Sequence, residues 1–449
     1  MAIRFGILRS PATARRIMGD SLPAEFPAPM MRATASLDLP EARPARAKPA
    51  LRPKPPQASA YDRNFWFSYA ANFFMVAAVS LLFRYSDFVA HLGGREQHLG
   101  WIVGVGMLGS LSMRIFLGAG IDRYGPRIIW IASLAGFVVS CLAQLMVARV
   151  DGSAIYFWRI VYQTSIAGCY GASIAYVSSR APVERLAEVV GTLGTSGFLG
   201  MQCGTLLTDF LSAHAPIWSM FCGAATMGFA SLVCATFGAR NAVRHPQHRR
   251  LPIFYVLRKY RPGPLLVVAA AMGFGLSLPT VFVRPFAASI QVASISWFFS
   301  VYTITAFGAR MALRRMADQY GTRSVALCGL SSLIAGMLCF IPITEGWHLI
   351  VPAFMIGAAH AMLFPAATAG VSRAFPARYR GLATTLTMAM FDFGAFVVSP
   401  LAGGLLWLAE RNGVAAYPTM FASVAAFLTI LAAAYAYSSR LVVAPLAAA

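Results

Sequence analysis

Charged side chains are scarce in this chain, because only 12% of its 449 residues are Asp, Glu, Lys or Arg. Soluble domains usually carry about 25% of such residues. Hydrophobic residues, in contrast, make up 58% of the sequence. This balance excludes a soluble protein of this length and indicates an integral membrane protein.

Acidic residues are scarcer than basic ones, with 16 Asp and Glu against 37 Lys and Arg and a formal net charge of +21. Such an excess could serve nucleic-acid binding, which needs basic residues interleaved with stacking aromatic residues on one soluble face. Here the basic residues lie in the N-terminal tail and in alternate loops. We therefore expect no nucleic-acid partner.

Motifs for catalysis and for metal binding are also missing. The seven cysteines lie in apolar runs without a Cys-x-x-Cys pair, so we expect neither a disulfide framework nor a metal site, and no cofactor. The sequence has no His-Glu-x-x-His, no Gly-x-Ser-x-Gly and no paired carboxylates, which argues against a membrane enzyme. It also lacks a Gly-x-x-x-x-Gly-Lys loop, so ATP hydrolysis is not the expected energy source.

Long apolar runs dominate what is present. Each is long enough to cross a hydrocarbon core about 30 Å thick as a helix. The twelve runs span 65–90, 98–119, 127–147, 154–179, 187–212, 216–238, 264–286, 294–313, 323–343, 347–372, 379–408 and 415–438. They predict an all-α membrane protein with 12 transmembrane helices.

The loops predict the orientation of these helices. Arginine is concentrated in the N-terminal tail and after every second run, so the positive-inside rule places both termini in the cytoplasm. Residues 1–60 are rich in Ala, Pro and Arg and are predicted to be a disordered basic tail. The basic segment 240–263 is predicted to be a solvated cytoplasmic linker, although it could instead bind anionic lipid or a partner.

One stretch of the chain occurs twice. When the sequence is shifted by 196 positions, residues 101–127 match residues 297–323 at eight of 27 positions, against roughly two expected from residue usage. The identical pairs include Arg114 with Arg310 and Asp122 with Asp318. In each copy two apolar runs are joined by a short turn with an acid, a glycine and an arginine, which indicates a tandem duplication.

This turn resembles the first signature motif of the major facilitator superfamily. The first copy supplies the motif residues Gly118, Asp122, Arg123, Gly125 and Arg127, with Pro126 where the family usually has a basic residue. The second copy keeps Asp318, Gly321 and Arg323. The resemblance implies that these residues control the change of conformation, with Asp122 meeting the start of the eleventh helix and Asp318 the start of the fifth, near Ala187.

The resemblance also implies the fold and the manner of action. It predicts two pseudosymmetric six-helix bundles, at 61–239 and 264–440, followed by a tail at 441–449. A substrate cavity would lie between the bundles near the membrane midplane, and rocking would expose it to either side. We expect a monomer in the cytoplasmic (inner) membrane of a bacterium, with the lipid bilayer as its surroundings.

Polar side chains inside the spans are the candidate functional residues, because they are costly in lipid. In the fourth span Arg159, Tyr162 and Gln163 suit a carboxylate or phosphate ligand, although an interhelical hydrogen bond is an alternative. Arg84 and Arg284 end the first and seventh spans, and Arg84 could simply pair with Asp87 one turn later. Glycines of the fifth and eleventh runs are predicted to be packing and rocking surfaces rather than binding groups.

Two titratable residues lie deepest in the membrane. Asp392 is the one acid near the centre of a span, and His360 lies in the middle of the tenth. Because alternating exposure could make Asp392 bind and release a proton, we expect these two residues to form a proton relay, with Tyr302 facing the same cavity. The alternative is that Asp392 pairs permanently with an arginine.

Together these features predict a secondary active transporter of a small organic solute, coupled to protons, with a lean toward anionic substrates. A drug or metabolite efflux pump of the same superfamily is one alternative, although the fifth run lacks the Gly-Pro motif usual in drug/proton antiporters. A transporter-like sensor that binds solute without moving it is another.

Overall fold

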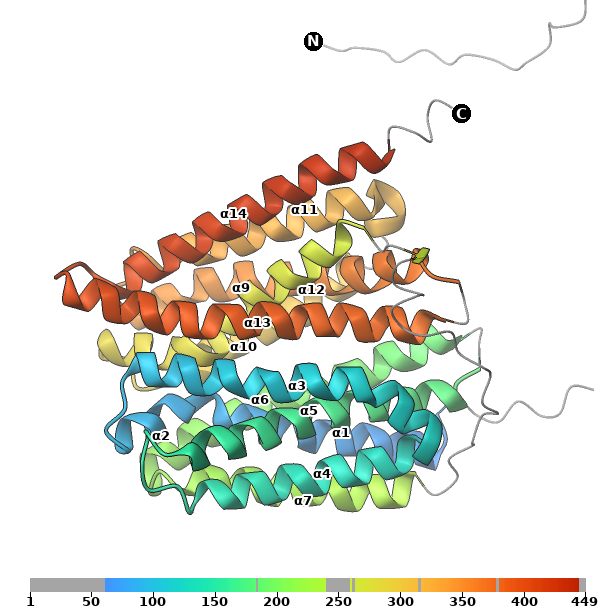
Figure 1. Cartoon of the computed structure of the whole chain (residues 1–449), viewed down its shortest axis with the longest axis horizontal. Helices are drawn as coiled ribbons and strands as arrows, with labels where there is room; N and C mark the ends of the chain where they lie inside the picture. Colours follow the sequence, from blue (N-terminus) through green and yellow to red (C-terminus); the bar gives the residue numbers. More distant parts are fainter. Residues whose placement is uncertain are drawn as a thin grey trace, which may run out of the picture. The chain divides into compact units, whose positions relative to one another are not determined.

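The fold comes from a computed structural model, which describes residues 61–182, 185–239, 259–260, 263–313, 316–376 and 379–443. The predicted N-terminal tail, nearly all of the predicted linker and the end of the C-terminal tail lie outside the described residues. Throughout the described part the secondary structure is helical (Figure 1).

The first half of the chain, residues 61–239, is called the N-half. Its first span is interrupted, because a 3-10 turn at Leu82–Arg84 separates α1 (Arg63–Leu81) from α2 (Tyr85–His91). The remaining helices are α3 (Glu96–Tyr124), α4 (Pro126–Gln144), α5 (Ser153–Arg180), α6 (Leu186–His214) and α7 (Ser219–Gly238).

The second half, residues 263–443, is called the C-half. Its helices are α9 (Leu265–Ser289), α10 (Ser296–Ala312), α11 (Met316–Cys339), α12 (Ile350–Arg373), α13 (Arg380–Arg411) and α14 (Ala416–Val443). With α1 and α2 counted as one span, the described helices number twelve, which confirms the fold class predicted from the apolar runs. The last helix continues past residue 440, into the segment predicted as a tail.

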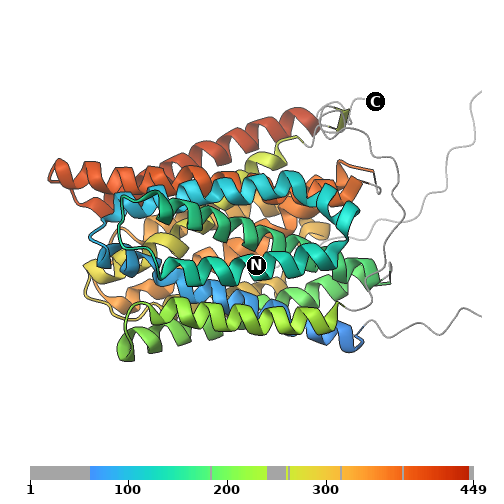
Figure 2. The same ribbon diagram turned by 60° about the horizontal axis from the view of Figure 1, so that its bottom comes forward.

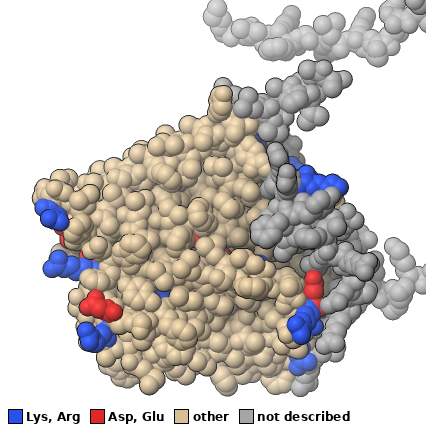
Figure 3. Space-filling view, viewed as in Figure 1, with Lys and Arg blue, Asp and Glu red and all other residues tan. Residues whose placement is uncertain are grey.

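Nine of the described helical segments are apolar and long enough to cross a membrane. The helices α5, α6 and α10 are not among the nine. In the view of Figure 3, charged side chains gather at the two ends of the helices, and only a few charged atoms show in the wide band between them. This distribution is what a bilayer imposes on a multi-pass membrane protein.

The two halves lie side by side, as Figures 1 and 2 both show. Between them α3 packs on α13, and α6 packs on α10. The α3–α13 contact is close because it is made by small residues: a Cβ atom added to Gly100 would lie 2.4 Å from the Ser399 carbonyl oxygen, and one added to Gly104 2.7 Å from the Pro400 ring.

The glycines of α6 divide into two groups. A Cβ atom added to Gly200 or Gly204 would lie 2.4 Å from a carbonyl oxygen of α1, so these two glycines permit close packing as predicted. Gly191 and Gly194 have no atom within 4 Å of an added Cβ. Close packing is therefore found at one end of the helix and not at the other, because the neighbouring helix diverges, and the predicted role of these glycines as a rocking surface stays a prediction.

The duplicated turns have the same backbone geometry. Gly125 has φ 83° and ψ 156°, and Gly321 has φ 79° and ψ 150°. This region is essentially restricted to glycine, because a Cβ atom would clash with the backbone. Each motif therefore has a glycine at the residue whose backbone angles turn the chain from one helix into the next.

We expect Gly125→Ala to destabilise the protein by about 1–3 kcal/mol, the usual cost of a side chain in such a backbone conformation. Thermal unfolding of the purified full-length protein measures the loss. Gly404→Ala is the matched control, because Gly404 has ordinary helical geometry and open space around its added Cβ. Equal melting temperatures for the two variants would contradict the assignment of strain to this turn.

Candidate functional site

We name the two ends of the helix assembly by residues found there. The Arg84 end is where α2 leads into α3, and the Asp122 end is where α3 leads into α4. Because successive spans alternate in direction, α10 begins at the Arg84 end and α13 begins at the Asp122 end.

A buried ion pair joins the halves in the membrane interior. The Arg114 Nε of α3 lies 2.9 Å from Oδ2 of Asp392 in α13, and the side chains of both residues are 9% exposed. The Ser110 hydroxyl donates a second hydrogen bond, of 2.6 Å, to the same oxygen. The carboxylate thus obtains two donors from the N-half, which offset the cost of its burial. In this structure Asp392 is paired with an arginine, as the alternative interpretation of the sequence stated.

The prediction that His360 and Asp392 share one relay does not match the contacts. Within the described part of the chain, the two residues are not joined by a hydrogen bond or an ion pair. The His360 Nδ1 of α12 instead shares a hydrogen bond with the Tyr302 hydroxyl of α10. The imidazole also packs on Phe198 of α6, with ring centroids 6.1 Å apart, and on Phe364 at 5.8 Å. His360 and Tyr302 therefore form a separate polar pair inside an aromatic cluster.

Arg159 of α5 is buried beside aromatic rings. Its guanidinium carbon lies 4.4 Å from the ring centre of Tyr85 and 4.7 Å from that of Tyr162, so cation–π attraction stabilises the charge. Its Nε has no hydrogen-bond partner in the described structure. The predicted neighbour Gln163 donates to the Met107 sulfur, 3.5 Å away. Arg159, which the sequence analysis identified, is therefore a buried cation whose Nε has no acceptor in the described structure.

Arg84 and Arg284 belong to an ionic network at the Arg84 end. Arg84 contacts the Asp87 carboxylate at 2.7 Å, as its sequence spacing suggested. Arg284 of the C-half contacts the same carboxylate at 3.0 Å, so Asp87 bridges the halves. Arg84 also lies 3.1 Å from Asp209 of α6. Both arginines are therefore held by carboxylates.

Asp209 makes the second bridge between the halves and was missed by the sequence analysis. One of its oxygens accepts hydrogen bonds from the Ser294 hydroxyl at 2.6 Å and from the backbone N–H groups of Ile295 and Ser296 at 3.0 and 2.8 Å. A carboxylate at a helix start satisfies free N–H groups and the positive end of the dipole. The sequence signal that could have identified Asp209 is an acid near one end of an apolar run, without a partner nearby in the sequence.

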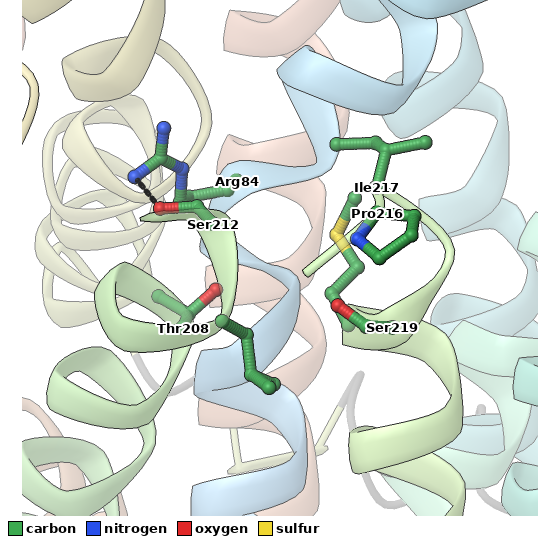
Figure 4. A pocket seen from close by; sticks show the side chains of 8 residues that line it. Arg84, Thr208, Ser212, Pro216, Ile217 and Ser219 are labelled. Atoms are coloured by element: carbon green, nitrogen blue, oxygen red, sulfur yellow. Dashed lines mark hydrogen bonds between the residues drawn. The ribbon is translucent and has the colours of Figure 1, made fainter. Parts of the chain in front are cut away.

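A small pocket borders this network. Its cavity volume is only about 20 Å³, and Figure 4 shows the Arg84 side chain at its edge, hydrogen-bonded to Ser212. The pocket lies within the N-half, where its remaining wall is formed by Thr208, Leu211, Pro216, Ile217, Ser219 and Met220. Because its arginine is already held by two carboxylates, this pocket offers no free cation to a ligand.

The motif residues occupy the Asp122 end. Gly118, Asp122 and Arg123 lie in the last turns of α3, and Arg127 lies in the first turn of α4. Arg323 donates hydrogen bonds to the Ser439 hydroxyl at 2.8 Å and to the Ala436 carbonyl at 3.2 Å, which ties the second turn to α14. The predicted contact of Asp318 with the start of α6 involves side chains outside the described residues.

This chain is similar to known proteins in sequence and in fold. The family model described as Major Facilitator Superfamily matches residues 65–289 and 265–445. Multidrug resistance protein MdtG of Salmonella typhi is 24% identical over 330 residues, covering 68% of this chain and 79% of that protein.

Solved structures share the fold at lower identity. The nucleoside transporter NupG has a TM-score of 0.69 at 14% identity, covering 84% of this chain and 99% of its own. The D-xylose-proton symporter has a TM-score of 0.61 at 15% identity, covering 81% of this chain and 95% of its own.

We expect Asp392→Asn and Arg114→Gln each to destabilise the protein by about 3–5 kcal/mol, because each leaves a buried group without its partner. The double variant should be markedly more stable than the sum of the single losses predicts, since no unpaired charge remains. Thermal unfolding of the four proteins in one detergent measures this coupling. Strictly additive losses would show that the two residues do not depend on each other.

Proposed function

This chain belongs to the major facilitator superfamily, and we propose that it is a proton-coupled secondary active transporter of a small organic solute that works by alternating access. The single observation that carries the proposal is the buried Asp392 carboxylate, bonded across the two halves by Arg114 and Ser110. A titratable group at the seam between the moving parts can link protonation to their motion.

The argument for coupling rests on the cost of charge in lipid. An acid at the centre of a span costs about 2.5–3.5 kcal/mol on insertion scales. Here Arg114 and Ser110 offset that cost only while α3 and α13 stay together. If the halves separate at this seam, a proton on Asp392 removes the charge and replaces the lost partners. Protonation would thus favour one conformation and release of the proton the other.

The orientation follows from the basic loops. We propose that both termini are cytoplasmic, that the Asp122 end faces the cytoplasm, and that the protein is a monomer in a bacterial inner membrane. The Arg84 end then faces outward, where Asp87 and Asp209 bridge to the C-half. Arg84 and Arg284 would act there as gate residues rather than as ligands of the solute.

The solute class is proposed from the interior cations. Arg159 is buried between two tyrosine rings and no described acid lies within ion-pair distance of it, which favours a solute with a negative charge. The name of the MdtG relatives favours drug efflux as the second candidate. A sensor that binds solute without moving it shares every structural feature named here, and counterflow of bound solute in vesicles separates it from a transporter.

Transport in proteoliposomes tests the function. Pools of labelled organic acids, nucleosides, sugars and amines are offered with and without an imposed pH gradient, and we expect at least one solute to accumulate in response to the gradient. Absence of gradient-driven accumulation in either direction would exclude proton coupling, and absence of counterflow as well would exclude transport of the solutes offered.

We expect Asp392→Asn to abolish gradient-driven accumulation and to preserve solute exchange at equilibrium, because the amide cannot carry the proton. Asp151→Asn is the matched control, since the Asp151 side chain is 71% exposed in a loop. If the Asp392 variant still concentrates solute in response to a pH gradient, Asp392 has a structural role and coupling lies elsewhere.

We expect Asp209→Asn to shift the protein toward an outward-open state. The amide keeps the shape of the carboxylate and loses its charge toward Arg84 and the α10 helix start. Cysteines introduced near Ser294 in a cysteine-free background should react faster with a membrane-impermeant maleimide in this variant. Unchanged labelling would show that the Asp209 contacts do not hold the gate closed.

A further inference from the structure

The duplicated arginines Arg114 and Arg310 stand at equivalent positions of α3 and α10 and have different surroundings. Arg114 is neutralised by Asp392 across the interface between the halves. The helix that faces α10 across that interface is α6, whose two acids, Glu188 and Asp209, lie at its ends. The duplication therefore retained the arginine in both halves but an interior acid opposite only one of them.

Arg310 has an aromatic neighbour where Arg114 has a carboxylate. Its guanidinium carbon lies 5.8 Å from the ring centre of Phe364 in α12. In the part of the chain that the structure describes, no Asp or Glu lies within ion-pair distance of Arg310, and none of its nitrogens has a hydrogen-bond partner. A guanidinium over a ring keeps its in-plane N–H groups free for a carboxylate.

The helical geometry of α10 shows which way Arg310 faces. Trp297, Ile304 and Met311 repeat every seven residues and are 73%, 70% and 50% exposed, so they mark the outer face of the helix. Thr303 is seven residues before Arg310 and shares its face, which lies about 100° around the helix from that stripe. Thr303 is 6% exposed, and its hydroxyl has no hydrogen-bond partner in the described structure. This inner face therefore carries a cation and a hydroxyl that both lack partners.

Aromatic rings surround this face. Phe364 also packs on His360, which shares its hydrogen bond with Tyr302. Phe198, contributed by the N-half, contacts both His360 at 6.1 Å and Phe307 of α10 at 6.4 Å. Through Phe364 this group of rings from both halves reaches Arg310, which has no acid partner among the described residues. A flat apolar body with one negative charge matches these groups.

We propose that Arg310 and the surrounding rings of Phe198, Phe307 and Phe364 form a binding site for an aromatic monocarboxylate. The carboxylate bonds the Arg310 guanidinium, and the ring of the ligand stacks among the phenylalanines. Arg310 then recognises the solute, whereas its duplicate Arg114 joins the halves. The inference rests on the proposed transport function, because it names the class of solute and the residues that bind it.

Binding of benzoate to the purified full-length protein tests the site without requiring transport. We expect the wild type to bind labelled benzoate, with excess unlabelled benzamide competing poorly because it has the same ring and no charge. Arg310→Gln should weaken benzoate binding at least about tenfold, the scale of one lost charge-assisted bidentate pair. Arg310→Lys keeps the charge without the planar fork and should weaken binding to a smaller extent.

Arg373→Gln is the matched control, because it removes an exposed arginine of the same half whose partner is Thr322. It should bind benzoate like the wild type. Phe364→Leu keeps the apolar volume and removes the ring, so it should weaken binding of benzoate more than binding of acetate. Monodisperse elution and an unchanged melting temperature establish that each variant is folded.

The inference is overturned if the wild type does not bind benzoate, or if both Arg310 variants bind it as tightly as the wild type. Failure of the transport function gives a different result. Benzoate binding that depends on Arg310, with no counterflow in proteoliposomes, would retain the site and reject the transporter. Counterflow of other solutes without Arg310-dependent benzoate binding would retain the transporter and reject the site.

Discussion

A charge inside a bilayer needs a partner, and this constraint explains the polar contacts between the two halves. The interior acid Asp392 has its donors, Arg114 and Ser110, on the opposite half. An ion pair of this kind contributes little net stability, since desolvation consumes most of the attraction, yet losing one partner is expensive. The pair therefore specifies how the halves meet more than how firmly each half folds.

The other ionic contacts described between the halves lie toward the Arg84 end. Asp87 bridges to Arg284, and Asp209 caps the start of α10. Close packing of α3 on α13 through Gly100 and Gly104 runs between this ionic network and the buried pair. The combination closes the Arg84 end by direct charge contacts and leaves the interior pair as the place where protonation could act on the same seam. The ionic network and the proposed coupling site are thus two parts of one interface.

Pseudosymmetry gives the molecule two copies of each element, and the copies differ in the partners of their polar residues. Both motif turns keep their glycine, because the backbone conformation there excludes any other residue. The paired arginines keep their identity and differ in their surroundings, an acid for Arg114 and a phenylalanine ring for Arg310. Duplicated positions whose partners differ are where two equivalent bundles acquire separate tasks.

The sequence by itself determined the twelve spans, the duplication and the glycine turns, because hydropathy and repeats are properties of consecutive residues. It also identified Asp392, His360 and Arg159 as costly groups in lipid, and the Arg84–Asp87 pair from its local spacing. Only the tertiary structure decided the partners. Arg114 and Asp392 are 278 residues apart, and their contact depends on how α3 packs on α13. For the same reason the sequence did not show the hydrogen bond between His360 and Tyr302 and missed Asp209, since side chains on different helices meet only where helix packing brings them together.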